Sequence, residues 1–192
     1  IKNSGEHLLG LINDVLDLSK VEAAKIELEH TAFRLDAFLA TLDKAFGPRA
    51  EEKGVAFRQE IDGDTKTPIL ADEKRLRQVL FNLIGNAIKF TEQGEVVCRV
   101  AMVSRHETEA VFRFGVQDTG IGLSEQARRR IFDAFSQGDG STTRQYGGTG
   151  LGLSISYGII RDYGGGILFE SEPGQYTRAI VNLPAFYSDV CA

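Results

Sequence analysis

The sequence predicts an α+β fold, a two-layer α/β sandwich in which one mixed sheet is covered by helices on one face and meets water on the other. Stretches with helical periodicity are interleaved along the chain with stretches that alternate between apolar and polar residues. Several of the alternating stretches are adjacent, which favours antiparallel pairing, so a single helix layer on a single sheet is the economical packing. A long, coiled-coil-like helix precedes this domain.

Length and composition exclude several classes of protein. The chain has 192 residues, of which 42% are hydrophobic, as expected for one globular domain with an additional segment. With 22 basic and 27 acidic residues the formal net charge is -5, which gives no electrostatic footprint for nucleic acid. No apolar run approaches the roughly 20 residues that cross a bilayer, so we expect no membrane contact by this fragment.

The cysteines and the first residues bear on the setting of the protein. Cys98 and Cys191 lie far apart without metal-type spacing, which favours reduced thiols and a cytoplasmic location. Ile1 begins in the middle of a helical pattern, so we expect the chain to be cut from a longer protein. That longer protein could be anchored in a membrane through segments outside this chain.

The first 26 residues predict a helix with an apolar stripe. The stripe consists of Leu8, Leu11, Ile12, Val15, Leu16, Leu18 and Val21. Because a lone helix cannot bury such a stripe on itself, we expect a helical hairpin or a dimeric bundle. Packing of the stripe on the following domain is the alternative.

The next elements are short. We expect a strand within residues 27–35, a helix over 38–46, a strand over 55–61 and a polar turn at 62–67. Asp36 is the candidate N-cap of that helix. Gly47 and Pro48 are expected to interrupt or end it.

The helix over residues 75–91 carries the widest apolar stripe of the chain. The stripe consists of Leu76, Val79, Leu80, Leu83, Ile84, Ala87 and Ile88. Asp72 is its expected N-cap, and Gly94 closes the loop that follows. The later elements are strands at 96–103 and 111–116, a short helix capped by Ser124 and ending near Phe132 and Phe135, a mobile loop at 138–148, a helix at 150–163, and strands at 167–172 and 177–183.

Three polar side chains lie beside that apolar stripe. Asn82, Asn86 and Lys89 follow one another at steps of four and three residues, so they share one helix face. Two amides and an amine in this position indicate a polar ligand. For Lys89, the alternative is an ordinary lysine on the helix surface.

Asp118 stands where a strand ends and is followed by two glycines. Gly120 and Gly122 allow the backbone to approach a ligand closely, and a carboxylate only accepts hydrogen bonds. The exocyclic amine of adenine only donates, so Asp118 is a candidate adenine-binding group, with Ile121 and Leu123 as apolar walls. An aspartate in an ordinary glycine turn remains the alternative.

A second glycine cluster opens the helix at residues 150–163. Gly148, Gly150 and Gly152 would let phosphate oxygens reach the main-chain amides at the helix start, which carry partial positive charge. The cluster matches neither a P-loop nor a dinucleotide fingerprint.

A triphosphate would bring a magnesium ion with it. Mg²⁺ prefers oxygen ligands, and Asn86 could supply one amide oxygen. Lys89 is placed to meet a phosphate, and Arg144 in the loop could close over the terminal phosphate.

Four motifs together resemble a known family. NLIGNAIKFT, DTGIGL, IFDAFSQ and GGTGLGLSI, in this order and spacing, resemble the N, G1, F and G2 boxes of the ATP-binding domain of sensor histidine kinases. That domain belongs to the superfamily of gyrase, Hsp90, histidine kinases and MutL. The resemblance covers residues 33–184 and implies a Bergerat-type fold. The arm SGEHLLGLINDVLDLSKVEAAKIELE resembles the second helix of the dimerisation and phosphotransfer domain, particularly in hybrid kinases.

The resemblance implies three segments and an ATP site that requires Mg²⁺. Residues 1–26 would be part of the dimerisation hairpin, 27–186 the ATP-binding domain, and 187–192 a tail or the start of a linker. In the site, Asn86 would bind Mg²⁺, Asp118 the adenine amine, and Lys89 the phosphates, with Phe90 near the base. The other implied site residues are Asn82, Gly120, Gly122, Arg144, Gly148, Thr149, Gly150, Leu151 and Gly152.

Two further positions follow from the same resemblance. Phe132 and Phe135 would anchor the lid over the nucleotide, although ordinary core aromatics are equally compatible with the sequence. The family usually has Gly followed by Ser or Thr where this chain has Tyr176 and Thr177, a departure on the base side of the site.

The resemblance also implies what the chain does. Gyrase-like ATPases carry a glutamate as general base four residues before the magnesium asparagine, whereas this chain has Asn82, which cannot accept the proton. Transfer of the γ-phosphate to a histidine is therefore favoured over hydrolysis. His7, His30 and His106 lack the family motif, so the acceptor would lie on a dimerisation domain outside this chain.

Partners and rival functions complete the expectation. The expected partners are that acceptor histidine, a response regulator receiver domain and, in the full-length protein, a second copy of the chain. The rivals are a nucleotide-binding regulatory or scaffold module without transfer activity and a gyrase-like or Hsp90-like ATPase. No catalytic residue is assigned from the sequence.

Overall fold

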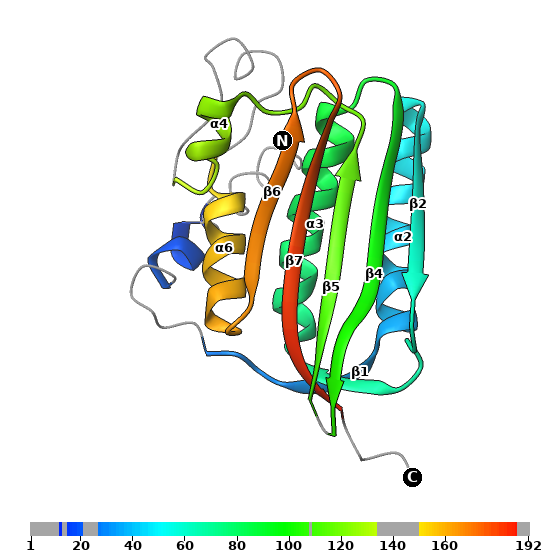
Figure 1. Cartoon of the computed structure of the whole chain (residues 1–192), viewed down its shortest axis with the longest axis vertical. Helices are drawn as coiled ribbons and strands as arrows, with labels where there is room; N and C mark the ends of the chain where they lie inside the picture. Colours follow the sequence, from blue (N-terminus) through cyan, green and yellow to red (C-terminus); the bar gives the residue numbers. More distant parts are fainter. Residues whose placement is uncertain (1–11, 13–14, 21–26, 108, 134–149, 188–192) are drawn as a thin grey trace.

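A layer of helices covers one face of a single sheet (Figure 1). The computed structural model describes residues 12, 15–20, 27–107, 109–133 and 150–187. The strands are β1 (Thr31–Arg34), β2 (Val55–Asp62), β3 (Pro68–Ala71), β4 (Gly94–His106), β5 (Glu109–Asp118), β6 (Gly166–Glu172) and β7 (Tyr176–Tyr187). The helices after the arm are α2 (Leu35–Lys53), α3 (Glu73–Phe90), α4 (Glu125–Arg129) and α6 (Gly152–Asp162). The predicted α+β fold with helices on one face is confirmed.

The sheet is mixed and is organised around its last strand. Its order is β1-β3-β7-β5-β4-β2, and β6 also pairs with β7. One edge of β7 pairs antiparallel with β5, whereas the other edge pairs with β6 and then, at Phe186, with β3. Among the described strands, β2 and β4 form the parallel pair. The sheet therefore brings the end of β5, at Asp118, beside the start of β7, at Thr177.

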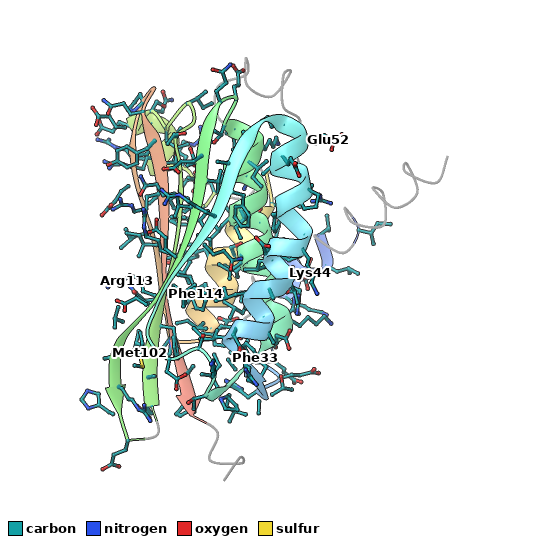
Figure 2. All side chains as sticks on the ribbon, turned by 90° about the vertical axis from the view of Figure 1, so that its right-hand side faces the viewer. Phe33, Lys44, Glu52, Met102, Arg113 and Phe114 are labelled. Atoms are coloured by element: carbon teal, nitrogen blue, oxygen red, sulfur yellow. The ribbon has the colours of Figure 1, made fainter. Side chains whose placement is uncertain are left out.

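The core lies between the sheet and helices α2, α3 and α6. All seven apolar positions predicted for the helix over 75–91 are buried in α3. Side chains alternate along β5, so that Phe114 points toward the helices while Arg113 points away from them (Figure 2). Asp72 is the N-cap predicted for α3, because its carboxylate accepts from the Arg75 amide at 2.9 Å.

The open face of the sheet carries a row of paired polar side chains. This charged row consists of Glu170, Arg178, Gln117, Arg99, Glu60, Arg58 and Glu95, and it crosses β6, β7, β5, β4 and β2. Its ion pairs leave the side chains partly exposed to water. The predicted wet face is therefore confirmed, and its polar groups hydrogen-bond across neighbouring strands.

Several sequence expectations were wrong. Asp36 is not the N-cap of α2, because the buried Leu35 already belongs to the helix and Arg34 is the N-cap residue. Helix α2 does not end at Gly47 and Pro48 but continues to Lys53, because Phe46 and Ala50 carry its buried stripe past the proline. Burial of that stripe outweighs the loss of one helical hydrogen bond at Pro48. Strand β3 was missed because four residues beginning with proline are too short to show alternation. Helix α4 ends at Arg129, before Phe132, although Ser124 caps it as expected.

Part of the arm helix packs against the domain. Residues 12 and 15–20 are helical, and Leu18 is buried in the core while Val15 is exposed. The Asp17 carboxylate accepts from Arg75 at 3.1 Å and from Gln78 at 2.7 Å, in the first turns of α3. The rest of the predicted arm lies outside the described residues. Among the described helices, none is long and apolar enough to span a membrane.

Candidate functional site

Three separate segments meet at the C-terminal half of α3. This half ends near the loop that follows β5, and the start of α6 lies beside the middle of α3 (Figure 1). The Ile121 amide of that loop donates to the Phe90 carbonyl at 3.4 Å, and the Asn82 amide donates to Ser156 of α6 at 3.0 Å. The motifs that are far apart in the sequence are therefore neighbours in the fold.

The last turn of α3 is held by its C-cap side chain and by groups from other segments. Its four final carbonyls have no helical partner, and each accepts from elsewhere. Thr91 Oγ1 donates to the Ala87 carbonyl at 2.8 Å, and Lys53 Nζ donates to the next two carbonyls at 2.7 and 2.6 Å. The Ile121 amide donates to the fourth, that of Phe90. The helix end that carries Asn86, Lys89 and Phe90 is thus fixed by α2 and by the loop after β5.

On one flank of α3, Asp118 forms a buried acceptor. Its side chain is at the end of β5 and the residue is only 6% exposed. The backbone amides of Gly120, at 2.9 Å, and of Thr177 donate to it. Burial nevertheless raises the pKa of the Asp118 carboxyl, because removal of water disfavours the charged form more than these amides favour it. Such an acceptor suits a ligand that donates a hydrogen bond.

Glycines let the loop after Asp118 lie against the neighbouring backbone. A Cβ on Gly120 would be 2.4 Å from the Phe90 carbonyl oxygen and 2.9 Å from Asp118 Oδ1. Gly122 has a φ of +65°, and a Cβ there would be 2.2 Å from the Glu172 carbonyl oxygen. The loop is tied further to β6 and to the turn after it, because Leu123 N donates to Ser171 at 2.8 Å and Gly174 N donates to the Ile121 carbonyl at 2.8 Å. Main-chain contacts therefore set the position of Asp118.

The departure at Tyr176 and Thr177 lies beside this acceptor. Thr177 pairs with Asp118 across β5 and β7, and its hydroxyl is 3.3 Å from that of Ser171. Ser171 in turn donates to the Tyr176 carbonyl at 2.7 Å. A threonine hydroxyl is thus present beside the carboxylate although the preceding glycine of the family pattern is absent.

On the other flank of α3, side-chain amides form the contact with α6. Asn86 Nδ2 donates to Asn82 Oδ1 at 3.2 Å, and Asn82 Nδ2 donates to Ser156 Oγ at 3.0 Å. The Ser156 hydroxyl donates to the Gly152 carbonyl at 2.8 Å. A Cβ on Gly152 would be 2.3 Å from Asn82 Oδ1, so glycine lets the two helices approach here.

Sequence reasoning missed Ser156. The signal available was a serine between apolar residues in LSISYGII, four residues after Gly152. A serine at that spacing can donate to the carbonyl one turn earlier, which hides it within an ordinary helical pattern.

Lys89 lies next to Phe90 on the last turn of α3. Its Nζ is 5.0 Å from the centroid of the Phe90 ring, a cation–π distance. Partial burial lowers the pKa of the Lys89 amine, because desolvation disfavours the charged form. An anionic ligand would oppose that effect and favour the charged amine.

The start of α6 is built for close approach to its amides. Gly150 has a φ of +71°, and Leu151, the N-cap residue, is buried and has no side-chain acceptor for the first amides of the helix. Arg144, Gly148, Thr149 and the predicted loop at 138–148 lie outside the described residues.

Of the two aromatic residues that the resemblance implies as lid anchors, the structure describes Phe132. Phe132 contacts Tyr157 of α6 and Phe169 of β6, with ring centroids 4.9 and 5.5 Å away. It therefore fixes the segment after α4 against the helix that begins at Gly152. Phe135 lies outside the described residues.

The donor set bears on which cation could bind. In the described part of the chain, no three or more His, Cys, Asp or Glu side chains cluster as metal ligands. A cation held here would take one amide oxygen from Asn86 and most of its ligands from phosphates and water. That pattern fits Mg²⁺, which keeps several waters and binds proteins through few oxygens.

A pocket between the β4–β5 turn and the end of β7 lies at the other end of β5 from Asp118.

Comparison with known proteins agrees with this geometry. The family described as "Histidine kinase-, DNA gyrase B-, and HSP90-like ATPase" matches residues 71–186. "Sensor histidine kinase GacS" of Pseudomonas protegens is 43% identical over 183 residues, which are 95% of this chain and 20% of that protein. "Signal transduction histidine-protein kinase BarA" of Escherichia coli is 39% identical over 175 residues, covering 91% of this chain and 19% of that protein.

Solved structures agree as well. Full-length ShkA, crystallised in complex with AMPPNP, has a TM-score of 0.81 and 38% identity, covering 97% of this chain and 37% of that one. The catalytic domain of histidine kinase ThkA has a TM-score of 0.66 and 28% identity, covering 81% of this chain and 95% of that one. The chain spans about a fifth of the length of these curated relatives. With the family model matched over more than half of its length, this chain belongs to the histidine kinase-, DNA gyrase B- and HSP90-like ATPase family.

Proposed function

We propose that this domain binds ATP with Mg²⁺ and transfers the γ-phosphate to a histidine on a dimerisation domain. The observation that carries the proposal is the convergence of a buried carboxylate, a pair of linked amides and a glycine-edged helix start around one half of α3. These three groups match the adenine, the cation and the phosphates of one nucleotide.

Each part of the nucleotide has its own partner in this proposal. Asp118 accepts from the exocyclic amine of adenine, and Phe90 lies near the base. Asn86 gives its amide oxygen to Mg²⁺, which neutralises phosphate charge. Lys89 and Arg144 meet the phosphates as cations. The glycine-rich segment from Gly148 through Thr149, Gly150 and Leu151 to Gly152 offers main-chain amides, and Gly120 and Gly122 keep Asp118 in place.

In the proposed transfer, a ring nitrogen of the acceptor histidine attacks the γ-phosphorus. The new P–N bond forms as the bond from the γ-phosphorus to the bridging oxygen breaks, and ADP leaves with the electron pair. The domain itself provides position and charge stabilisation. Asn82 occupies the place where a water-activating glutamate would stand, and both ends of its amide are engaged in hydrogen bonds. We therefore expect slow hydrolysis.

The proposal extends to the parts of the protein outside this domain. Residues 1–26 would complete a dimerisation hairpin with a preceding helix, 27–186 would fold as the catalytic unit, and 187–192 would lead toward further segments. The exposed Ile12, Val15 and Leu16 support a helical partner for the arm. One neighbouring structure is histidine kinase ThkA with response regulator protein TrrA, which supports a receiver domain as the later phosphate acceptor here. We place the domain in the cytoplasm.

Labelling with radioactive ATP tests the transfer. We expect the chain alone to stay unlabelled and an added phospho-acceptor hairpin to become labelled at its histidine. Strong self-labelling of the chain at histidine would contradict the proposal. Binding of nucleotide without any transfer would instead indicate a regulatory module, and steady ATP turnover without acceptor would indicate a gyrase-like ATPase.

A further inference from the structure

A chain of hydrogen bonds of fixed direction connects α6 with Asn86. Ser156 donates its hydroxyl proton to the Gly152 carbonyl at 2.8 Å. A hydroxyl has one proton, so toward Asn82, at 3.0 Å, Ser156 can only accept. The atom that Asn82 turns toward α6 must therefore be its NH₂ group.

The direction then passes from one amide to the next. With its NH₂ group toward Ser156, Asn82 presents its carbonyl oxygen to Asn86, whose NH₂ donates to it at 3.2 Å. The free end of the Asn86 amide is consequently its oxygen. An amide turned the other way would present NH₂ groups, which cannot bind a cation.

Burial makes this arrangement depend on Ser156. The serine is only 1% exposed, so water has little access to replace its oxygen as the acceptor for Asn82. Helices α3 and α6 run side by side, and the hydrogen bond between Asn82 and Ser156 joins them (Figure 1).

We propose that Ser156 is a positioning residue for the magnesium site. It holds the Asn82 amide in one orientation and, through it, turns the oxygen of Asn86 toward the metal. This inference rests on the proposed function, since it assumes that Asn86 binds Mg²⁺ with the nucleotide. Partners behind a metal ligand that fix its orientation contribute strongly to metal affinity.

The test separates magnesium-dependent from magnesium-independent nucleotide binding. Calorimetry with a non-hydrolysable ATP analogue is run on the whole chain, once with Mg²⁺ and once with EDTA. For Ser156→Ala we expect affinity with Mg²⁺ to fall about tenfold, and affinity in EDTA to change less than about twofold. Ser156→Thr, which keeps the hydroxyl, should bind the analogue with Mg²⁺ as tightly as the parent does.

The matched control is Ser154→Ala. Ser154 is also buried in α6 and its hydroxyl also donates to a carbonyl one turn earlier, that of Leu151, at 2.8 Å. Its removal should leave both affinities unchanged. Thermal unfolding of each variant verifies that the chain is folded.

A double-mutant cycle tests the route through Asn82. Asn82→Ala should lower the affinity measured with Mg²⁺ but not that measured in EDTA, as Ser156→Ala does. The double variant should lose no more affinity with Mg²⁺ than Asn82→Ala alone. Equal magnesium dependence in Ser156→Ala and the parent, or an equal loss with Mg²⁺ and with EDTA, would overturn the inference. If the parent itself binds the analogue equally well with and without Mg²⁺, the magnesium site of the proposed function fails, and the inference fails with it.

Discussion

The two flanks of α3 hold their functional groups by different means. On the Asp118 flank, main-chain amides donate the hydrogen bonds that hold the loop after β5, and its glycines lie against backbone oxygens of Phe90 and Glu172. On the Asn86 flank, the contact with α6 runs through side-chain amides and a hydroxyl, and Gly152 lies against the Asn82 side chain.

This difference predicts which flank tolerates substitutions without loss of the fold. Backbone atoms cannot move aside without displacing a whole segment, whereas a side-chain amide can adopt another rotamer at small cost. Substitutions on the Asp118 flank should therefore affect stability and binding together. Those on the Asn86 flank should affect function while the fold persists.

Gly120→Ala should have the largest effect. Its Cβ would lie 2.4 Å from the Phe90 carbonyl oxygen, so the loop or the end of α3 must shift. We expect destabilisation of about 3 kcal/mol by chemical denaturation and loss of nucleotide binding in calorimetry. A variant with parental stability and affinity would show that this flank is less rigid than its backbone contacts indicate.

Asp118→Asn should come next. The change replaces one carboxylate oxygen by an NH₂ group, which cannot accept from the adenine amine, and it removes the negative charge that strengthens this hydrogen bond. We therefore expect nucleotide affinity to fall about 100-fold. If calorimetry found parental affinity, the adenine assignment of Asp118 would be wrong.

Asp118→Asn should lower nucleotide affinity but raise stability, and the gain in stability should depend on pH. The pKa of the Asp118 carboxyl is higher in the folded state than in the unfolded state. The carboxyl therefore contributes fully to stability below its unfolded-state pKa, and this contribution is lost as pH rises through its folded-state pKa. The variant does not ionise there. Its melting temperature relative to the parent should therefore increase from about pH 4 to neutral pH, and a constant difference would argue against a raised pKa.

Gly152→Ala should separate function from fold. The Cβ would displace only the end of the Asn82 side chain and no backbone, so stability should stay within about 1 kcal/mol of the parent. Affinity for the magnesium nucleotide should still fall about tenfold. A destabilisation as large as that of Gly120→Ala would remove the distinction between the flanks.

Arg99→Ala on the charged row should have the smallest effect. Its guanidinium bonds Glu60 at 2.6 Å and Gln117 at 2.8 Å, but these side chains remain partly exposed. We expect less than about 1 kcal/mol of destabilisation by denaturant unfolding and unchanged nucleotide affinity. A larger loss would mean that the row acts as a cooperative network.

The sequence predicted those features whose signals are local and repeated. The stripe of α3 and the strands other than β3 follow from spacing over many residues, and the caps at Asp72 and Ser124 follow from a capping residue just before a helical segment. Burial beyond Pro48 and pairing of the short β3 depend on distant segments, so they left no local signal. For the same reason the motifs indicated Asn82 and Asn86 but not Ser156, whose importance arises only when α6 packs on α3.

Helix α3 has a further consequence because of its length. Its 18 residues span about 27 Å. Asp17 of the arm grips Arg75 and Gln78 near one end, and Asn86 and Phe90 stand near the other. The arm and the proposed nucleotide site are therefore attached to one continuous helix, with no loop between them.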